Sequence, residues 1–180
     1  MFYTMIFVIG LINNNGYVLI GSSAQDMARK FKHKDLMPVF QFFLVCFSSF
    51  IRIINSRFLL KIKHRNKLIT VVLMWTLGYI LFFISYYIEN DFGFALSLLA
   101  TVLIGAFTSL GGCTSLGYMK TLPPLLVGAY GSGTGMAGIS GAGIYLLVTT
   151  VFKIDFAQIC LIMIPLGFIY LLCFFWVLRN

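Results

Sequence analysis

The sequence predicts an all-α membrane protein with six transmembrane helices, on two observations: its composition and the length of its apolar segments. Of the 180 residues, 60% are hydrophobic and 10% are charged, whereas roughly a quarter are charged in a soluble domain. A soluble domain of this size still exposes about a third of its unfolded surface, so it could not hide this much apolar area. Six apolar segments follow one another, each about as long as the roughly 20-residue helix that crosses a bilayer: residues 2–22, 36–54, 68–88, 92–116, 125–151 and 156–178. None alternates as the strands of a membrane barrel do, so we expect one six-helix domain over residues 1–180, half of a major-facilitator-type bundle.

The first segment, residues 2–22, is interrupted at its middle by three asparagines, residues 13–15. It lacks the basic start of a signal peptide, so we expect a retained helix. Asn13, Asn14 and Tyr17 follow three- and four-residue steps and share one helical face. An unpaired polar group in an apolar environment costs a few kcal/mol, so this face must meet other helices or water. Two readings stay open: a hydrogen-bond clamp between helices, and a substrate cavity lined by these three residues.

The second and third segments, residues 36–54 and 68–88, are separated by a basic stretch, residues 52–67. With six spans this stretch lies on the same side of the membrane as the N-terminus, and we expect no charged residue deep in any span. Because Lys and Arg accumulate in short cytoplasmic loops, we expect both termini in the cytosol. The basic stretch could also hold anionic lipid head groups. That side collects eight cations and no acid: Arg52, Arg57, Lys61, Lys63, Arg65, Lys67, Lys120 and Arg179.

The fifth segment, residues 125–151, contains GSGTGMAGISGAG at residues 131–143, which fits the G-x-G-x-x-G pattern. A dinucleotide loop needs a preceding strand and an acid about 20 residues on. Asp155 has nearly that spacing, but it lies beyond a further apolar run at a predicted membrane edge. The segment also lacks the Gly-Lys-Ser/Thr of a phosphate-binding loop. We therefore expect no cofactor.

Close helix packing accounts for more of these glycines, because small side chains let helices approach in lipid. Small residues repeat every four positions along three ridges, which predicts packing on more than one neighbour: Gly131/Gly135, Gly133/Ala137/Gly141 and Thr134/Gly138/Ala142. Glycine also weakens a helix by nearly 1 kcal/mol relative to alanine. The turn at residues 131–135 could therefore be open and bind a polar substrate, through Ser132, Gly133, Thr134 and Gly135. In the sixth segment, Pro165 is expected to let the helix bend.

Several stretches resemble the battenin family. Asn13-Asn14-Asn15-Gly16-Tyr17-Val18, followed by Ser23-Ala24-Gln25-Asp26-Met27, is similar to its N-N-x-x-Y-V and S-A-A-x-D-I patterns. Asp35-Leu36-Met37-Pro38 resembles its D-I-L-P. Residues 132–138, S-G-T-G-M-A-G, resemble its S-G-T-G-G-A-G. Gly112 stands where the family pattern G-L-G-E has an acid.

This resemblance spans nearly the whole chain, and it implies a fold related to the major facilitator superfamily. It also implies a lysosomal or vacuolar membrane and a link to pH, basic amino acid and glycerophosphodiester homeostasis. A facilitator site lies between two six-helix halves, and six spans are one such half. The resemblance therefore predicts a transporter, or half of one, for small polar solutes.

Other function classes fit less well. The alternative is a non-transporting scaffold or regulatory subunit that packs through the glycine-rich fifth segment. Either protein would lie in the lipid bilayer, with a second copy or another membrane subunit as partner. We expect no enzyme, because the spans hold no nucleophile–base or acid pair. The two histidines lie on opposite sides of the membrane, so we expect no metal site. Nucleic-acid binding is not expected, because most aromatic residues lie within the spans.

Overall fold

The computed structural model describes residues 1–59, 62–120 and 122–179. Each of the six predicted segments is a helix, and the described residues contain no strand. Two short turns flank the second helix: the 3₁₀ turn η1 (Lys34–Leu36) and the π turn η2 (Asn55–Leu59). The helices are α1 (Phe2–Lys30), α2 (Met37–Ile54), α3 (His64–Tyr87), α4 (Asp91–Met119), α5 (Pro124–Thr150) and α6 (Phe156–Arg179).

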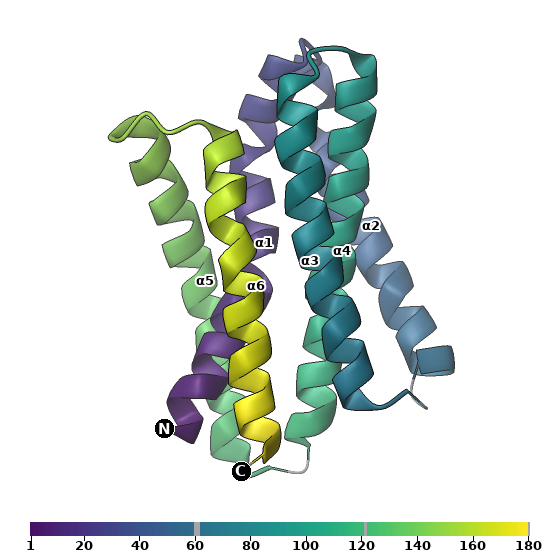
Figure 1. Ribbon diagram of the computed structural model, residues 1–180, viewed down its shortest axis with the longest axis vertical. Helices are drawn as coiled ribbons and strands as arrows, with labels where there is room; N and C mark the ends of the chain where they lie inside the picture. Colours follow the sequence, from purple (N-terminus) through teal and green to yellow (C-terminus); the bar gives the residue numbers. More distant parts are fainter. Residues whose placement is uncertain (60–61, 121, 180) are drawn as a thin grey trace.

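Successive helices run in opposite directions along the long axis of the molecule (Figure 1). Both termini therefore lie at one end, together with the α2–α3 and α4–α5 connections; we call this the terminal end (Figure 1). The other three connections lie at the opposite, far end (Figure 1). α1 packs mainly on α5 and also contacts α2, α4 and α6, while α3 packs between α4 and α6. α1 thus contacts helices on both sides of it, α5 and α6 on one side and α2 and α4 on the other (Figure 1).

Five helical stretches are long and apolar enough to cross a membrane: α1, Lys34–Phe58, α3, α4 and α6. This confirms the predicted membrane protein and implies a lipid bilayer around it. The 27-residue α5 has the length to span but is not among these five. The reason is its composition, because glycine, serine and threonine occupy positions that apolar side chains fill in the other helices.

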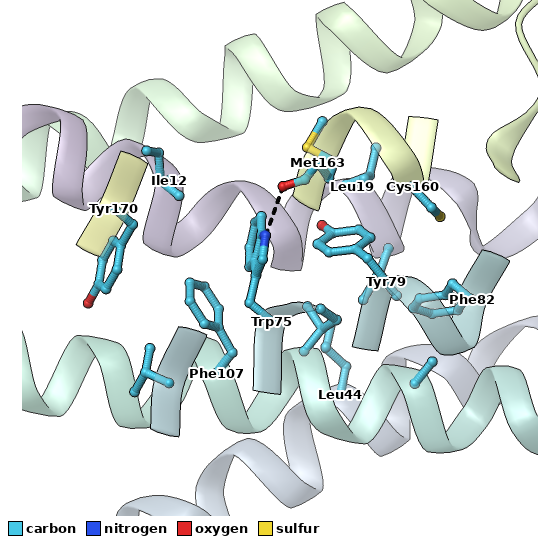
Figure 2. Close-up of a cluster of buried hydrophobic side chains, with 14 of the residues drawn as sticks. Ile12, Leu19, Leu44, Trp75, Tyr79, Phe82, Phe107, Cys160, Met163 and Tyr170 are labelled. Carbon is cyan, nitrogen blue, oxygen red and sulfur yellow. Dashed lines mark hydrogen bonds between the residues drawn. The ribbon is translucent and has the colours of Figure 1, made fainter. Parts of the chain in front are cut away.

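The core is built around Trp75 of α3, a fully buried side chain. Its indole N–H donates a hydrogen bond to the carbonyl oxygen of Met163 in α6 at 2.8 Å (Figure 2). Glycines on two other helices make room for the ring. A Cβ atom on Gly16 of α1 would lie 2.8 Å from it, and one on Gly167 of α6 would lie 2.5 Å from it. α6 continues without a break past Pro165, so the predicted bend there stays a prediction.

The basic stretch, residues 52–67, is largely helical rather than a loop. Arg52 lies within α2, inside the apolar stretch Lys34–Phe58. Lys67 lies in the first turn of α3, where it is buried and its ammonium donates to the Asn55 side-chain oxygen at 3.2 Å. Both cations lie in the terminal turns of their helices, so the expectation that no charged residue lies deep in a span stays a prediction. A long basic side chain can lay its aliphatic stem along apolar surface while its charged end reaches a polar site. Lys61 and Asn180 lie outside the described residues.

Candidate functional site

Two adjoining cavities, of about 300 and 240 Å³, open between α1, α2, α4 and α5. They share Asn14, Arg52 and Thr108, so we treat them as one central polar cavity. Its size is near the lower limit of about 300 Å³ for small-molecule sites. The remaining lining residues are Asn13, Tyr17, Val45, Ser48, Ser49, Ser109, Gly112, Cys113, Leu116, Tyr130 and Thr134.

Asn13 is held at the wall that α1 and α4 form. Its side-chain nitrogen donates to the carbonyl oxygen of Thr108 at 3.2 Å. Its side-chain oxygen is buried and has no hydrogen-bond partner among the described residues. Gly111 leaves the space for this oxygen, since a Cβ atom there would collide with it. An unpaired buried amide oxygen is costly, and here it belongs to a residue that lines the cavity.

Asn14 and Tyr17 tie α1 to the other two walls. The Asn14 side-chain nitrogen donates to the carbonyl oxygen of Thr134 in α5 at 3.0 Å. The Tyr17 hydroxyl accepts a hydrogen bond from the side-chain nitrogen of Gln41 in α2 at 3.0 Å. The structure thus contains both arrangements that the sequence left open. The amides clamp helices together, and the same side chains line a cavity.

Of the four α5 residues predicted to bind substrate, the structure brings only Thr134 to the central polar cavity. α5 is a closed helix through residues 131–135, and successive helical residues point about 100° apart. Gly133 therefore faces the backbone of α1, where a Cβ atom would collide with the Phe7 carbonyl oxygen. Ser132 and Gly135 are exposed on other faces.

One of the three predicted glycine ridges packs against α1. Gly133, Ala137 and Gly141 are buried, and a Cβ atom on Gly141 would lie 3.1 Å from Val18. At Gly131, Gly135 and Gly138 a Cβ atom would meet no heavy atom within 4 Å among the described residues. Among the described helices, α1 is the one extensive contact of α5, so packing on more than one neighbour stays a prediction.

Arg52 was not among the predicted site residues. It begins the basic stretch that was expected to form a loop, because apolarity ends near residue 54, whereas the helical backbone continues to Leu59. A signal was present: Val45, Ser48, Ser49 and Arg52 follow three- and four-residue steps and so share one face of α2. Arg52 is the one charged side chain among the described residues that line the central polar cavity.

Sequence comparisons match the chain to one family. The family described as CLN3 protein matches residues 4–180. Battenin of Dictyostelium discoideum is 26% identical over 94% of the chain, which covers 39% of that relative. Protein BTN1 of Saccharomyces cerevisiae is 28% identical over 96% of the chain, covering 40% of that relative. Protein btn1 of Aspergillus fumigatus is 32% identical over 78% of the chain, covering 30% of that relative.

The chain thus spans at most about two fifths of the length of these relatives. No solved structure matches it. The family match covers nearly every residue, including all six helices and the residues of the central polar cavity. Together with the apolar helices and the polar motifs of α1 and α5, it identifies the chain as a member of the CLN3 protein family, the family of battenin.

Proposed function

We propose that the chain is one half of a battenin-like transporter in a lysosomal or vacuolar membrane. It binds a small anionic polar solute, of the glycerophosphodiester class, in the central polar cavity. It carries out no covalent chemistry. Transport requires a second six-helix half, and this arrangement follows the facilitator fold that the family resemblance implies.

The observation that carries this proposal is the position of Arg52. A guanidinium group matches the oxygens of a phosphate or carboxylate with several parallel N–H donors. Amide and hydroxyl groups around it, from Asn14, Thr108 and Tyr17, suit the hydroxyls of a glycerol group. No carboxylate stands among the described lining residues to hold the cation of a basic amino acid. The charge of the cavity therefore favours the phosphodiester over the basic amino acid.

The outward face of α5 supports a second half. Gly131, Gly135 and Gly138 lie open on that face, and α5 falls short of the apolarity of the other five helical stretches. Small residues allow close contact between helices in lipid, and a facilitator site lies between two such halves. A helix that α1 covers on one side only is suited to a protein neighbour on its other side.

The proposed orientation has both termini in the cytosol. Among the described residues, the basic side chains Arg57, Lys63, Arg65 and Lys120 lie near the terminal end, where the α2–α3 and α4–α5 connections are (Figure 1). Lys and Arg in short connections favour the cytoplasmic side. The central polar cavity, which Arg52 lines, then lies nearer the cytosolic side, and the far end faces the lumen.

The competing function is a scaffold that uses α5 only for packing. The hydrogen bonds of Asn13 and Asn14 to backbone carbonyls favour it, because such bonds stabilise a helix bundle without any ligand. A scaffold would not need Arg52 in its cavity. Replacing Arg52 therefore separates the two functions, because the hydrogen bonds of Asn13 and Asn14 do not involve it.

The test is uptake into liposomes that contain the purified chain. We expect uptake of a radiolabelled glycerophosphodiester to exceed uptake of radiolabelled arginine. We expect Arg52→Gln to reduce it roughly tenfold, because a hydrogen bond to a charged group contributes about 1.5–3 kcal/mol. Lys63→Gln, a basic residue of the same end that is outside the cavity, is the control and should transport as the wild type does.

Thr134→Val is a second variant, since it keeps the side-chain shape and removes a hydroxyl that lines the cavity. Its hydroxyl donates to the Gly131 carbonyl oxygen within α5 at 2.8 Å, so the helix loses little when it is removed. Equal glycerophosphodiester uptake by wild type, Arg52→Gln and Thr134→Val would contradict the proposed site. Absence of saturable glycerophosphodiester binding to the folded chain in liposomes would favour the scaffold, because a missing second half by itself abolishes transport but leaves the central polar cavity in place.

A further inference from the structure

A second pocket, of about 320 Å³, lies at the far end of the bundle, between α1, α3, α5 and the start of α6. It shares no residue with the central polar cavity. Its volume falls within the range of about 300–1,000 Å³ that small-molecule sites occupy. We call it the far-end pocket. Its lining residues are Asp26, Met27, Lys30, Tyr86, Tyr145, Thr149, Lys153, Ile154, Asp155 and Phe156.

Charges of both signs line this pocket, unlike the central polar cavity. The carboxylates are Asp26 and Asp155, and the ammonium groups are Lys30 and Lys153. Three hydroxyl groups, two of them on tyrosines, and three apolar side chains make up the rest of the lining. A pocket with both signs of charge is complementary to a ligand that carries both signs. A ligand with a single charge leaves the pocket groups of its own sign without a partner, so it binds less well.

Lys30 is already engaged by the protein. Its ammonium group donates a hydrogen bond to Glu89 at 2.9 Å and lies 3.9 Å from the centroid of the Tyr86 ring. The hydrogen bond and the positive charge of Lys30 lower the pKa of the Glu89 carboxyl group, so this pair stays charged. Lys30 therefore holds Tyr86 and the α3–α4 connection at the edge of the far-end pocket. Its ammonium group already has a partner, so it is not available to a ligand.

Asp26 is engaged on one side only. Its Oδ2 atom accepts a hydrogen bond from the Tyr145 hydroxyl at 2.6 Å, which ties α1 to α5 beside the pocket. Lys153 and Asp155 stand in the connection between α5 and α6 and take part in none of the ion pairs between described residues. Asp155 interacts with the Tyr86 hydroxyl at the pocket wall, as Asp26 does with the Tyr145 hydroxyl, and a neutral hydroxyl leaves each carboxylate charged. The pocket thus offers the ammonium group of Lys153 and the two carboxylates to a ligand.

We infer that the far-end pocket binds a small zwitterion that carries an ammonium and a carboxylate group, such as a free α-amino acid. The ligand carboxylate pairs with Lys153, and its ammonium group lies between Asp155 and Asp26. The tyrosine rings and Ile154 contact the ligand side chain. This site is separate from the central polar cavity, and the inference does not rest on the proposed transport of an anionic solute.

The test is equilibrium binding of radiolabelled L-alanine to the purified chain in lipid nanodiscs. We expect saturable binding, with propionate and ethylammonium, which each lack one of the two charges, competing at least roughly tenfold less well than unlabelled L-alanine. Lys153→Gln and Asp155→Asn should each weaken binding roughly tenfold, because each removes one charged hydrogen bond. No saturable binding, or competition by propionate or by ethylammonium equal to that by L-alanine, would overturn the inference.

The matched controls are Lys34→Gln and Asp35→Asn, a lysine and an aspartate near the same end but outside the pocket. They should bind L-alanine as the wild type does, and equal losses in all four variants would overturn the inference. Arg52→Gln should also leave L-alanine binding unchanged, and a loss there would place the ligand in the central polar cavity instead. Circular dichroism and gel filtration establish that each variant is folded.

Discussion

At the scale of single residues, Gly112 sets the charge balance of the central polar cavity. A Cβ atom there would lie 3.5 Å from the Asn13 side-chain nitrogen and 3.5 Å from the Tyr130 hydroxyl, which are ordinary contacts. The position therefore has room for a side chain that would enter the cavity. Because a glycine stands here, Arg52 has no carboxylate beside it among the described lining residues.

Gly112→Glu should reverse the preference between solutes. A carboxylate in the same cavity would offset the charge of Arg52, so we expect glycerophosphodiester uptake to fall and arginine uptake to rise. Gly112→Ala is the control and should leave both rates close to those of the wild type, because its Cβ atom fits. Liposome uptake of both radiolabelled solutes measures the ratio. The same ratio in Glu and Ala variants would show that the charge of the cavity does not select the solute.

The sequence predicted part of this site, and the missing part has a physical explanation. Helical spacing alone placed Asn13, Asn14 and Tyr17 on one face, and all three line the central polar cavity. Spacing could not tell which face of α5 meets α1, so Ser132 and Gly135 were grouped with Thr134 although they point elsewhere. Arg52 was missed because the apolarity of a segment indicates only where the helix contacts lipid. A cation near the end of such a helix can instead face a polar cavity between helices, as Arg52 does.

At the scale of elements, the α1–α5 crossing is a contact between backbones. A Cβ atom on Gly10 would collide with the Tyr130 carbonyl oxygen, and one on Gly133 would collide with the Phe7 carbonyl oxygen. The two glycines are thus reciprocal, each opening space for the other helix. Because Asn14 bonds to α5 along the same contact, the closeness of this crossing also sets the position of a cavity wall.

Gly133→Ala should destabilise the protein, and Gly135→Ala should not. Overpacking typically costs about 1–3 kcal/mol, and the Gly133 methyl group would press on backbone that cannot move aside easily. At Gly135 the methyl group meets open space, so the helix gains up to about 1 kcal/mol of propensity. Unfolding in a denaturing detergent, followed by circular dichroism, gives both values. Similar losses for the two variants would mean that α1 and α5 do not cross at Gly133.

Helix positions were predicted well, but one helix end was not. The first predicted span stops at residue 22, where the sequence turns polar, while α1 continues to Lys30. Apolarity marks where lipid contact ends, whereas a helix ends where its backbone hydrogen bonds end. The extra turns carry Asp26 and Lys30, whose side chains pair with Tyr145 and Glu89. Those contacts come from distant parts of the chain and cannot be read from local composition.

At the scale of the whole molecule, the alternation of six helices was predictable, and their lateral arrangement was not. Antiparallel succession follows from short connections, and it brings both termini to one end as expected (Figure 1). Which helices touch was not predictable, since lipid is as apolar as a leucine side chain and gives no pattern that separates a lipid-facing surface from a helix-facing one. Glycine was the useful signal, because it marked the fifth segment for close packing, but it did not tell which helix would be the neighbour; the structure shows that it is α1.

A cysteine on the open face of α5 should crosslink two copies of the chain. In a variant without the four native cysteines, Gly135→Cys should give a disulfide-linked product of about twice 20.2 kDa in membranes. Phe168→Cys is the control, because Phe168 is exposed on α6 and lies at a comparable distance from the terminal end of its helix. Crosslinking of Phe168→Cys but not of Gly135→Cys would place the contact between copies on another face.

The position of Trp75 makes its fluorescence a reporter of helix motion. The chain has two tryptophans, and Trp75 lies on α3 with its ring against glycines of α1 and α6. Indole fluorescence responds to water and to neighbouring polar groups, and this ring is fully buried, with its N–H group bonded to the Met163 carbonyl oxygen. Any motion that separates α1 or α6 from α3 would wet the ring and shift its emission to longer wavelength. In a Trp176→Phe background, opening and closing of the bundle could be followed in real time without an attached label.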